Sequence, residues 1–123
     1  MNSLFDLRLH LGTLGSCPIA VIKALRDEVA VVRPPEWNRF PHGFVHIFVG
    51  GYASGYFGYL WAELLASVGL EPFAEAGLVD RATGDRFREV LSRGATPITA
   101  DSIRAFRGRD PDPASMKLRH GLQ

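Results

Sequence analysis

Three tyrosines and two glycines in one short stretch are the residues of this sequence best suited to chemistry. The stretch GGYASGYFGY contains Gly50, Gly51, Tyr52, Tyr56 and Tyr59. Glycines permit backbone angles that other residues avoid, and they permit a mobile loop. Phenols donate hydrogen bonds, which in a water-excluded cleft hold a substrate carbonyl and stabilise a developing oxyanion. The alternative is that the tyrosines pack at a helix interface with their hydroxyls satisfied.

Two histidines four residues apart, His42 and His46 in HGFVH, have the histidine spacing of the zinc motif H-E-x-x-H. That motif needs both rings on one helical face and a glutamate at its second position. Here the second position is Gly43, and Pro41 precedes the pair. We therefore expect hydrogen-bonded loop histidines rather than metal ligands.

The single cysteine, Cys17, cannot form a disulfide within the chain and has no evident histidine partner. We interpret it as a small core residue rather than a nucleophile. A lone cysteine also favours a reducing compartment. Asp6 and Arg8 interrupt the apolar run that an export signal needs, so the expected location is the cytoplasm.

The composition is that of a folded protein of one-domain size, with 123 residues, 46% of them hydrophobic and 22% charged. A net charge of +1 argues against a dedicated nucleic-acid binder. Eight of the twelve arginines lie in residues 81–119 with acidic residues among them, which indicates solvated helix faces.

A long uncharged stretch raises the question of a membrane span, because residues 40–62 contain no Lys, Arg, Asp or Glu. The stretch also contains Pro41, histidines, glycines and tyrosines, and few Leu or Ile. We therefore expect no membrane contact. The stretch is interpreted as a buried loop that runs into a buried helix, or as a segment that faces a cleft.

The N-terminal part of the sequence predicts two helices and an irregular segment. Residues 2–10 have the pattern of a helix end, and Pro18 suits the first turn of a second helix. Helical spacing then continues through Ile22, Leu25, Val29 and Val32. Pro34 and Pro35 stop this helix. Residues 33–51 are rich in turn formers and predict a long irregular Gly-rich loop.

The next predicted helix carries an apolar stripe formed by Phe57, Trp61, Leu64, Leu65 and Val68. Tyr52, Tyr56 and Tyr59 fall on the opposite face at 100° per residue, and they are all the tyrosines of the chain. Gly69 and Pro72 are predicted to interrupt the helix, and a short apolar turn is expected to follow.

The remaining helices are predicted mainly from their end signals. Asp80 suits the N-cap of a helix that runs through Leu91. Thr96 and Pro97 predict the start of another helix, whose buried side holds Ile103 and Phe106. A last short helix is expected over residues 113–119. No strand alternation is evident, so the predicted class is all-α, with a single partial domain over residues 1–123.

The sequence resembles a known family. The run NRFPHGFVHIFVGGYASGYFGYLWAELLA resembles the C-terminal part of the catalytic domain of the thimet-oligopeptidase family of zinc metallopeptidases. The resemblance continues through GLVDRATGDRFREVLSRG and FRGRDP to RHGLQ, and LFDLRLH and EVAVVRPP upstream are also similar. It implies a large, almost wholly helical, cytosolic enzyme that cuts short peptides in a deep channel. In the family, zinc is held by H-E-x-x-H and a downstream glutamate, and the motif glutamate is the general base.

The resemblance also implies roles for particular residues. Gly50 and Gly51 match the flexible glycine pair that closes on substrate, and Tyr52 matches the tyrosine after it. Tyr56 and Tyr59 match tyrosines that contact substrate and steady the tetrahedral intermediate, so catalytic roles are implied for both, with oxyanion stabilisation by Tyr59. A further substrate-binding residue is implied at a histidine frequent in this branch of the family, His46.

The sequence departs from the family pattern as well. These residues include no H-E-x-x-H and no downstream zinc glutamate, Phe57 replaces a usual tyrosine, and Gly69 and Pro72 fall where the family has an uninterrupted helix. We therefore expect a substrate-binding fragment of a zinc metalloendopeptidase with no zinc ligand set, inactive alone. The alternatives are a non-catalytic helical module that binds peptides or a partner protein, and one half of a split peptidase whose other half carries the zinc.

Overall fold

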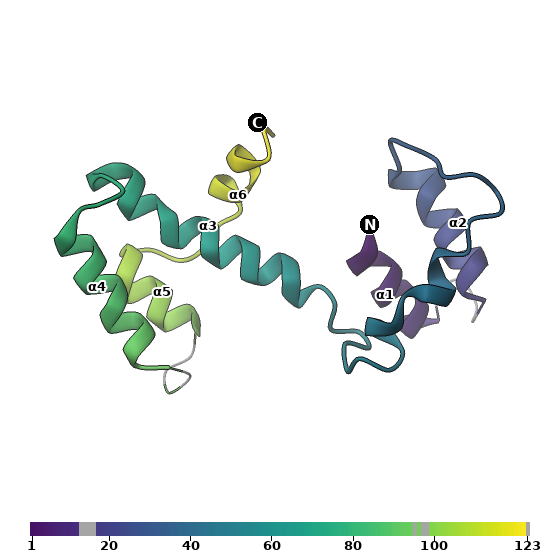
Figure 1. Cartoon of the computed structure of the whole chain (residues 1–123), viewed down its shortest axis with the longest axis horizontal. Helices are drawn as coiled ribbons and strands as arrows, with labels where there is room; N and C mark the ends of the chain where they lie inside the picture. Colours follow the sequence, from purple (N-terminus) through teal and green to yellow (C-terminus); the bar gives the residue numbers. More distant parts are fainter. Residues whose placement is uncertain (13–16, 95, 97–98, 123) are drawn as a thin grey trace. The chain divides into compact units, whose positions relative to one another are not determined.

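The computed structural model describes residues 1–12, 17–94, 96 and 99–122 (Figure 1). Every regular element in those residues is a helix, which confirms the all-α class. Contacts divide the chain into two compact units, Met1–Tyr59 and Leu60–Gln123, named below the N-terminal unit and the C-terminal unit. The single partial domain stays a prediction. Among the described residues, no helix combines the length and the apolarity that crossing a bilayer requires.

The N-terminal unit contains two α-helices that pack on each other, α1 (Asn2–Leu11) and α2 (Pro18–Val29) (Figure 1). The helix predicted at residues 2–10 is confirmed, and Gly12 ends it in a left-handed conformation with φ of 67°. Pro18 is the first residue of α2, as predicted. Arg8 joins the two helices by donating hydrogen bonds of 2.6 and 3.0 Å to the Glu28 carboxylate.

Helix α2 is shorter than its apolar pattern predicts. It ends at Val29, and Ala30 is already extended, with φ of −84° and ψ of 121°. The prediction that Val32 continues the buried stripe is wrong, because its side chain is 82% exposed. Pro34 lacks the N–H that would bond to the Ala30 carbonyl, and a proline also disfavours helical backbone in the residue before it.

The irregular segment predicted at residues 33–51 is confirmed, with two short 3-10 turns inside it. These turns are η1 (Phe40–Gly43) and η2 (Val45–Ile47). Side chains from the turns and from both helices form the core of the unit, which consists of Phe5, Val21, Ile22, Leu25, Phe44 and Ile47. Aromatic rings therefore anchor the irregular backbone to the two helices.

Cys17 does not belong to this core. Its side chain is exposed, so the prediction of a small core residue is wrong. Cys17 is the N-cap residue of α2 and precedes its first turn. It therefore precedes the first residue of α2 that packs into the core, Val21.

The C-terminal unit contains the main part of α3 (Gly58–Ala76), followed by α4 (Arg81–Ser92), α5 (Thr99–Arg107) and α6 (Ala114–Arg119). The Asp80 cap is confirmed, because its carboxylate accepts the Thr83 N–H at 2.7 Å. This hydrogen bond lowers the pKa of Asp80. Helix α6 confirms the short last helix. The predicted start at Thr96 and Pro97 depends on a residue, Pro97, that lies outside the described residues.

Helix α3 runs without a break through the positions where the sequence predicts an interruption. Gly69 and Pro72 both lie inside it and are buried, so that prediction is wrong. Pro72 lacks the N–H that would bond to the Val68 carbonyl, at a cost of about 3 kcal/mol in a helix interior. Tertiary packing opposes this cost, because the Phe73 ring lies 5.8 Å from that of Phe87 and 6.2 Å from that of Phe106.

A nearly buried carboxylate connects three elements of the C-terminal unit. The Glu71 side chain, on α3, is 14% exposed and accepts hydrogen bonds from Arg107, Arg109 and Ser115. Burial works to raise the pKa of Glu71, but these hydrogen bonds together outweigh burial and hold it below its ordinary value. Glu71 therefore ties α5, the segment after it and α6 to α3.

Candidate functional site

The structure brings the three tyrosines together within the N-terminal unit. The Tyr59 ring centroid lies 4.9 Å from that of Tyr56 and 5.3 Å from that of Tyr52. Tyr52 and Tyr59 remain 40% and 48% exposed, so a ligand can reach them. We call residues 50–59 the tyrosine loop.

The tyrosines do not form the helical face that the sequence predicts, because α3 begins only at Gly58. Tyr52 and Tyr56 lie in successive turns instead. The Gly55 N–H donates to the Tyr52 carbonyl at 2.9 Å, and the Tyr59 N–H donates to the Tyr56 carbonyl at 3.3 Å. The prediction that the tyrosines share a helical face is therefore wrong, but the three rings do lie close together.

The two glycines at the start of the tyrosine loop serve different purposes. A Cβ on Gly50 would lie 2.8 Å from the Cα of His46, which is closer than real Cβ atoms approach backbone. Gly51 has a φ of 79°, in the left-handed region that favours glycine. The Tyr52 N–H then donates to the His46 carbonyl at 3.1 Å. The pair thus folds the loop tightly against η2, while a mobile loop stays a prediction.

His46 joins the aromatic cluster through its ring, whose centroid lies 6.1 Å from those of both Tyr52 and Tyr56. His42 lies in η1 and His46 in η2, so the two histidines do not share a helical face. Within residues 1–12, 17–94, 96 and 99–122, no group of three or more His, Cys, Asp and Glu side chains is placed to hold a metal ion. The described residues therefore do not fit a zinc ion, and we assign none of them as ligands.

The residue that sequence reasoning missed is Asp6, which is fully buried on α1. One of its carboxylate oxygens accepts the Ser54 N–H and the other accepts the Tyr56 N–H, both at 2.9 Å. The Nδ1 atom of His10 lies 2.9 Å from the first oxygen. The available signal was an acidic residue beside the apolar Phe5 and four residues before a histidine.

The phenols of the cluster also affect one another. A hydrogen bond between the Tyr52 and Tyr59 side chains, assisted by desolvation, raises the pKa of Tyr59. A raised pKa means that the bond favours the protonated phenol. A phenol is protonated at neutral pH in any case, and the raised pKa keeps Tyr59 so, with a hydroxyl that donates either to Tyr52 or to a ligand that displaces Tyr52.

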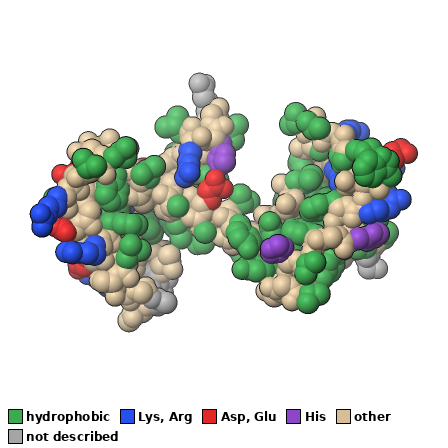
Figure 2. Space-filling model, in the orientation of Figure 1, with side chains coloured by type: hydrophobic (Ala, Val, Ile, Leu, Met, Phe, Trp, Pro, Cys, Tyr) green, Lys and Arg blue, Asp and Glu red, His purple; other side chains and the backbone are tan. Residues whose placement is uncertain are grey.

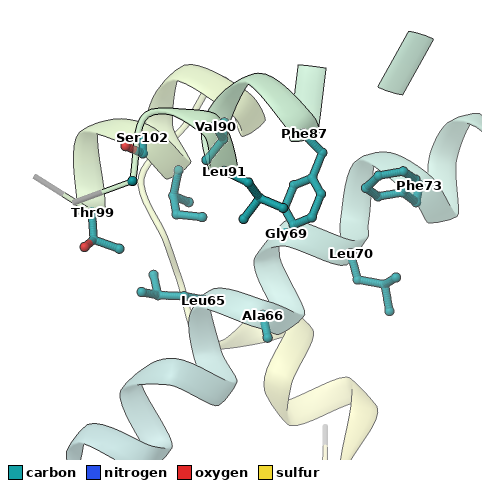
Figure 3. A pocket seen from close by; sticks show the side chains of 12 residues that line it. Leu65, Ala66, Gly69, Leu70, Phe73, Phe87, Val90, Leu91, Thr99 and Ser102 are labelled. Atoms are coloured by element: carbon teal, nitrogen blue, oxygen red, sulfur yellow. The ribbon is translucent and has the colours of Figure 1, made fainter. Parts of the chain in front are cut away.

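The C-terminal unit has a separate cavity of about 490 Å³ between α3, α4 and α5 (Figure 3). Figure 3 shows Phe87 and Leu91 of α4 above Gly69 of α3. Among the described residues that line it, the polar side chains are the hydroxyls of Thr99 and Ser102. The cavity suits an apolar group, and its described lining residues include no acid or base for catalysis. Hydrophobic side chains are also exposed elsewhere on the face drawn in Figure 2.

Comparison with known proteins shows that the sequence is similar to a family of peptidases. The model of peptidase family M3 matches residues 1–122. Oligopeptidase A of Escherichia coli is 42% identical over an alignment of 124 positions, which covers 98% of this chain and 18% of the relative. The organellar oligopeptidase A of Arabidopsis thaliana is 35% identical over 95% of this chain and 16% of the relative. Dipeptidyl carboxypeptidase of E. coli is 45% identical over 64% of this chain and 12% of the relative. The chain thus spans less than a fifth of the length of these relatives.

Proposed function

Because the chain belongs to peptidase family M3, we propose that it forms the substrate-binding segment of a metalloendopeptidase that hydrolyses short oligopeptides. The observation that carries this proposal is the cluster of three partly exposed phenols that follows the glycine pair in the tyrosine loop. The names of the relatives, oligopeptidase A and dipeptidyl carboxypeptidase, support a peptide as the ligand.

Each residue of the cluster has a role in this proposal. Tyr59 is held protonated and donates a hydrogen bond to the oxygen of the scissile carbonyl, where negative charge develops. Tyr56 stands beside it as a second donor. Three further residues line the peptide path, namely Gly51, Tyr52 and His46, and Gly50 keeps the turn close to His46.

The metal centre of the proposed reaction belongs to other residues. The family resemblance implies zinc, but the described residues offer no group of three ligands. We therefore assign no step to the metal, and we expect these 123 residues alone neither to bind zinc tightly nor to hydrolyse peptides. The zinc-bearing part of the catalytic domain, in the same polypeptide or on a second chain, is the proposed partner.

A chimera tests the proposal directly. This chain would replace the stretch of E. coli oligopeptidase A that aligns with it, and peptide hydrolysis would be measured with a quenched fluorescent oligopeptide. We expect an active chimera, in which Tyr59→Phe lowers kcat by roughly 10²–10³-fold and leaves KM nearly unchanged, as for the loss of an oxyanion donor.

Ser92→Ala is the matched control, because it also removes one hydroxyl but lies on α4, where Ser92 donates to the Glu89 carbonyl. This variant should keep the activity of the chimera. A folded chimera whose kcat is the same with Tyr59 or Phe at that position would contradict the role of Tyr59. Chelator-sensitive hydrolysis by the 123-residue chain itself would contradict the placement of the metal centre.

The apolar cavity of the C-terminal unit favours a second candidate function, a helical module that binds a partner protein or peptide without turnover. Its lining of Leu65, Leu70, Phe73 and Phe87 resembles a groove that accepts apolar side chains. Leu65→Glu would place a charge in the cavity, whereas Leu78→Glu changes a residue that is already 73% exposed. The measurement is saturable binding of the zinc-bearing segment to this chain. Binding that is lost in Leu65→Glu, is kept in Leu78→Glu and is accompanied by no peptide hydrolysis would favour this function over the first.

A further inference from the structure

We propose that Asp6 is the positioning residue of the tyrosine loop, and that its buried carboxylate determines where the phenols stand. The effect of Asp6 on peptide hydrolysis rests on the proposed function, whereas its effect on the position of the loop does not. Asp6 touches neither a substrate nor a reacting atom in this proposal. It acts through the backbone of residues 54–56.

The contacts of Asp6 explain why it is buried at all. Its side chain is fully inaccessible, and a buried carboxylate is unfavourable unless hydrogen bonds satisfy it. Each oxygen accepts one backbone hydrogen bond of 2.9 Å, from the Ser54 amide and the Tyr56 amide respectively, and the Nδ1 atom of His10 lies 2.9 Å from the first oxygen and 2.8 Å from the Asp6 carbonyl oxygen. Two of these three partners belong to the tyrosine loop, which makes the loop the element that the carboxylate organises.

The backbone that Asp6 holds is not one that the chain adopts readily by itself. Ser54 has a φ of 55°, and non-glycine residues seldom occupy this left-handed region. A charge-assisted hydrogen bond to the Ser54 N–H stabilises that conformation. Removal of the acceptor should therefore release the turn.

The turn and the phenols are connected by direct packing. The Tyr56 N–H is bonded to Asp6, and the Tyr56 ring lies 4.9 Å from both the Phe44 and the Tyr59 rings. Tyr59 contacts Tyr52 in turn, at 5.3 Å. A shift of the backbone at Tyr56 therefore moves the whole cluster, including the donor proposed for the oxyanion.

The pKa values of the tyrosines, measured by titration of the full 123-residue chain, report on this arrangement in the absence of peptide. All three tyrosines lie in the cluster, so the ultraviolet absorbance of tyrosinate reports on it alone. In Asp6→Asn, the side-chain NH₂ faces one of the two amides and cannot accept its hydrogen bond. We expect the highest tyrosine pKa of the wild type to fall toward the ordinary value in this variant.

Asp27→Asn is the control, because it removes an exposed carboxylate of the same unit that pairs with Arg33 at 2.9 Å. It should titrate as the wild type does. An Asp6→Asn chain with the wild-type helical circular dichroism and an unchanged tyrosine titration would overturn the proposal.

Amide hydrogen exchange on the wild type keeps the proposal testable if Asp6→Asn does not fold. The Ser54 and Tyr56 amides should exchange as slowly as the amides of α1. Exchange of both at the rate of the exposed Val31 and Val32 amides would overturn the proposal without any variant.

The oligopeptidase chimera separates this proposal from the proposed function. There Asp6→Asn should lower kcat by about tenfold or more in a chimera that circular dichroism shows to be folded, since a misplaced donor affects the transition state. A wild-type chimera that folds without hydrolysing peptides would contradict the proposed function and leave the titration result standing. An active Asp6→Asn chimera with wild-type kcat would contradict the positioning role.

Discussion

Each unit contains a carboxylate with little exposure, Asp6 at 0% and Glu71 at 14%, and the two are satisfied by different kinds of donor. Asp6 in the N-terminal unit is held by two backbone amides of a loop and by His10. Glu71 in the C-terminal unit is held by the side chains of Arg107, Arg109 and Ser115. Amide donors determine the path of a backbone, whereas long side chains only join one helix to another. The first carboxylate therefore shapes a site, and the second stabilises a scaffold.

The glycines of the two units differ in the same way. Gly50 has no room for a side chain, because the His46 backbone occupies the place of a Cβ. Gly69 has room, because its nearest neighbour would be the edge of the Phe87 ring at 3.9 Å, an ordinary contact. Glycine is thus required near the tyrosines and is dispensable in α3.

The largest stability effect is expected from Gly50→Ala. The added Cβ meets backbone atoms of His46 at 2.8 and 2.9 Å, so the turn must shift, at about 2–3 kcal/mol of unfolding free energy. Urea unfolding followed by circular dichroism measures the loss, and the tyrosine titration should change with it. Gly43→Ala is the control, since nothing lies within 4 Å of its Cβ position. Equal stabilities for the two variants would show that the close approach at Gly50 is unimportant.

Glu71→Gln should destabilise the chain by about 2 kcal/mol, because, among the described residues, Arg107 and Arg109 each lose one of two carboxylate partners and keep only Glu75 and Asp112 respectively. The effect should depend on pH. The pKa of Glu71 is lower in the folded chain than its ordinary value of 4.5, so its stabilisation is fully present above about that pH and is lost as the pH falls through the folded pKa. Urea unfolding of both proteins at several pH values should therefore show the gap closing in acid. A gap that widens in acid would contradict this sign.

Gly69→Ala is expected to act in the opposite direction to Gly50→Ala. Alanine favours a helix interior over glycine by about 0.5–1 kcal/mol, and its methyl group fits beside Phe87. The melting temperature should therefore rise. A lower melting temperature would mean that the added methyl group has less room beside Phe87 than the 3.9 Å distance indicates.

The smallest effect is expected from the exposed ion pairs of the C-terminal unit. Arg93 pairs with Glu89 on α4, and both side chains are at least half exposed. Arg93→Ala should change stability by no more than about 0.5 kcal/mol, and less at high salt. Urea unfolding at low and high salt measures this change. A loss of unfolding free energy as large as that of Glu71→Gln would show that the exposed ion pair stabilises the chain as much as the nearly buried Glu71 does.

Several features of the fold were predictable because they depend on neighbours in sequence. The Asp80 cap, the end of α4 one residue after Leu91 and the buried Ile103 and Phe106 follow from helix signals a few residues long. The importance of the GGYASGYFGY stretch was evident from its residue types. The same local signals misplace α3, where Gly69 and Pro72 predict a break that tertiary packing overrides.

The sequence by itself determined the helical class, most helix ends, the membership of peptidase family M3 and the identity of the tyrosines. Only the tertiary structure decided that those tyrosines stand on turns, that Cys17 is exposed and that Asp6 supports the loop. The physical reason is the range of the interactions. Helix periodicity and caps act over a few residues, whereas the bond from Ser54 to Asp6 joins residues 48 positions apart. No local pattern contains that contact.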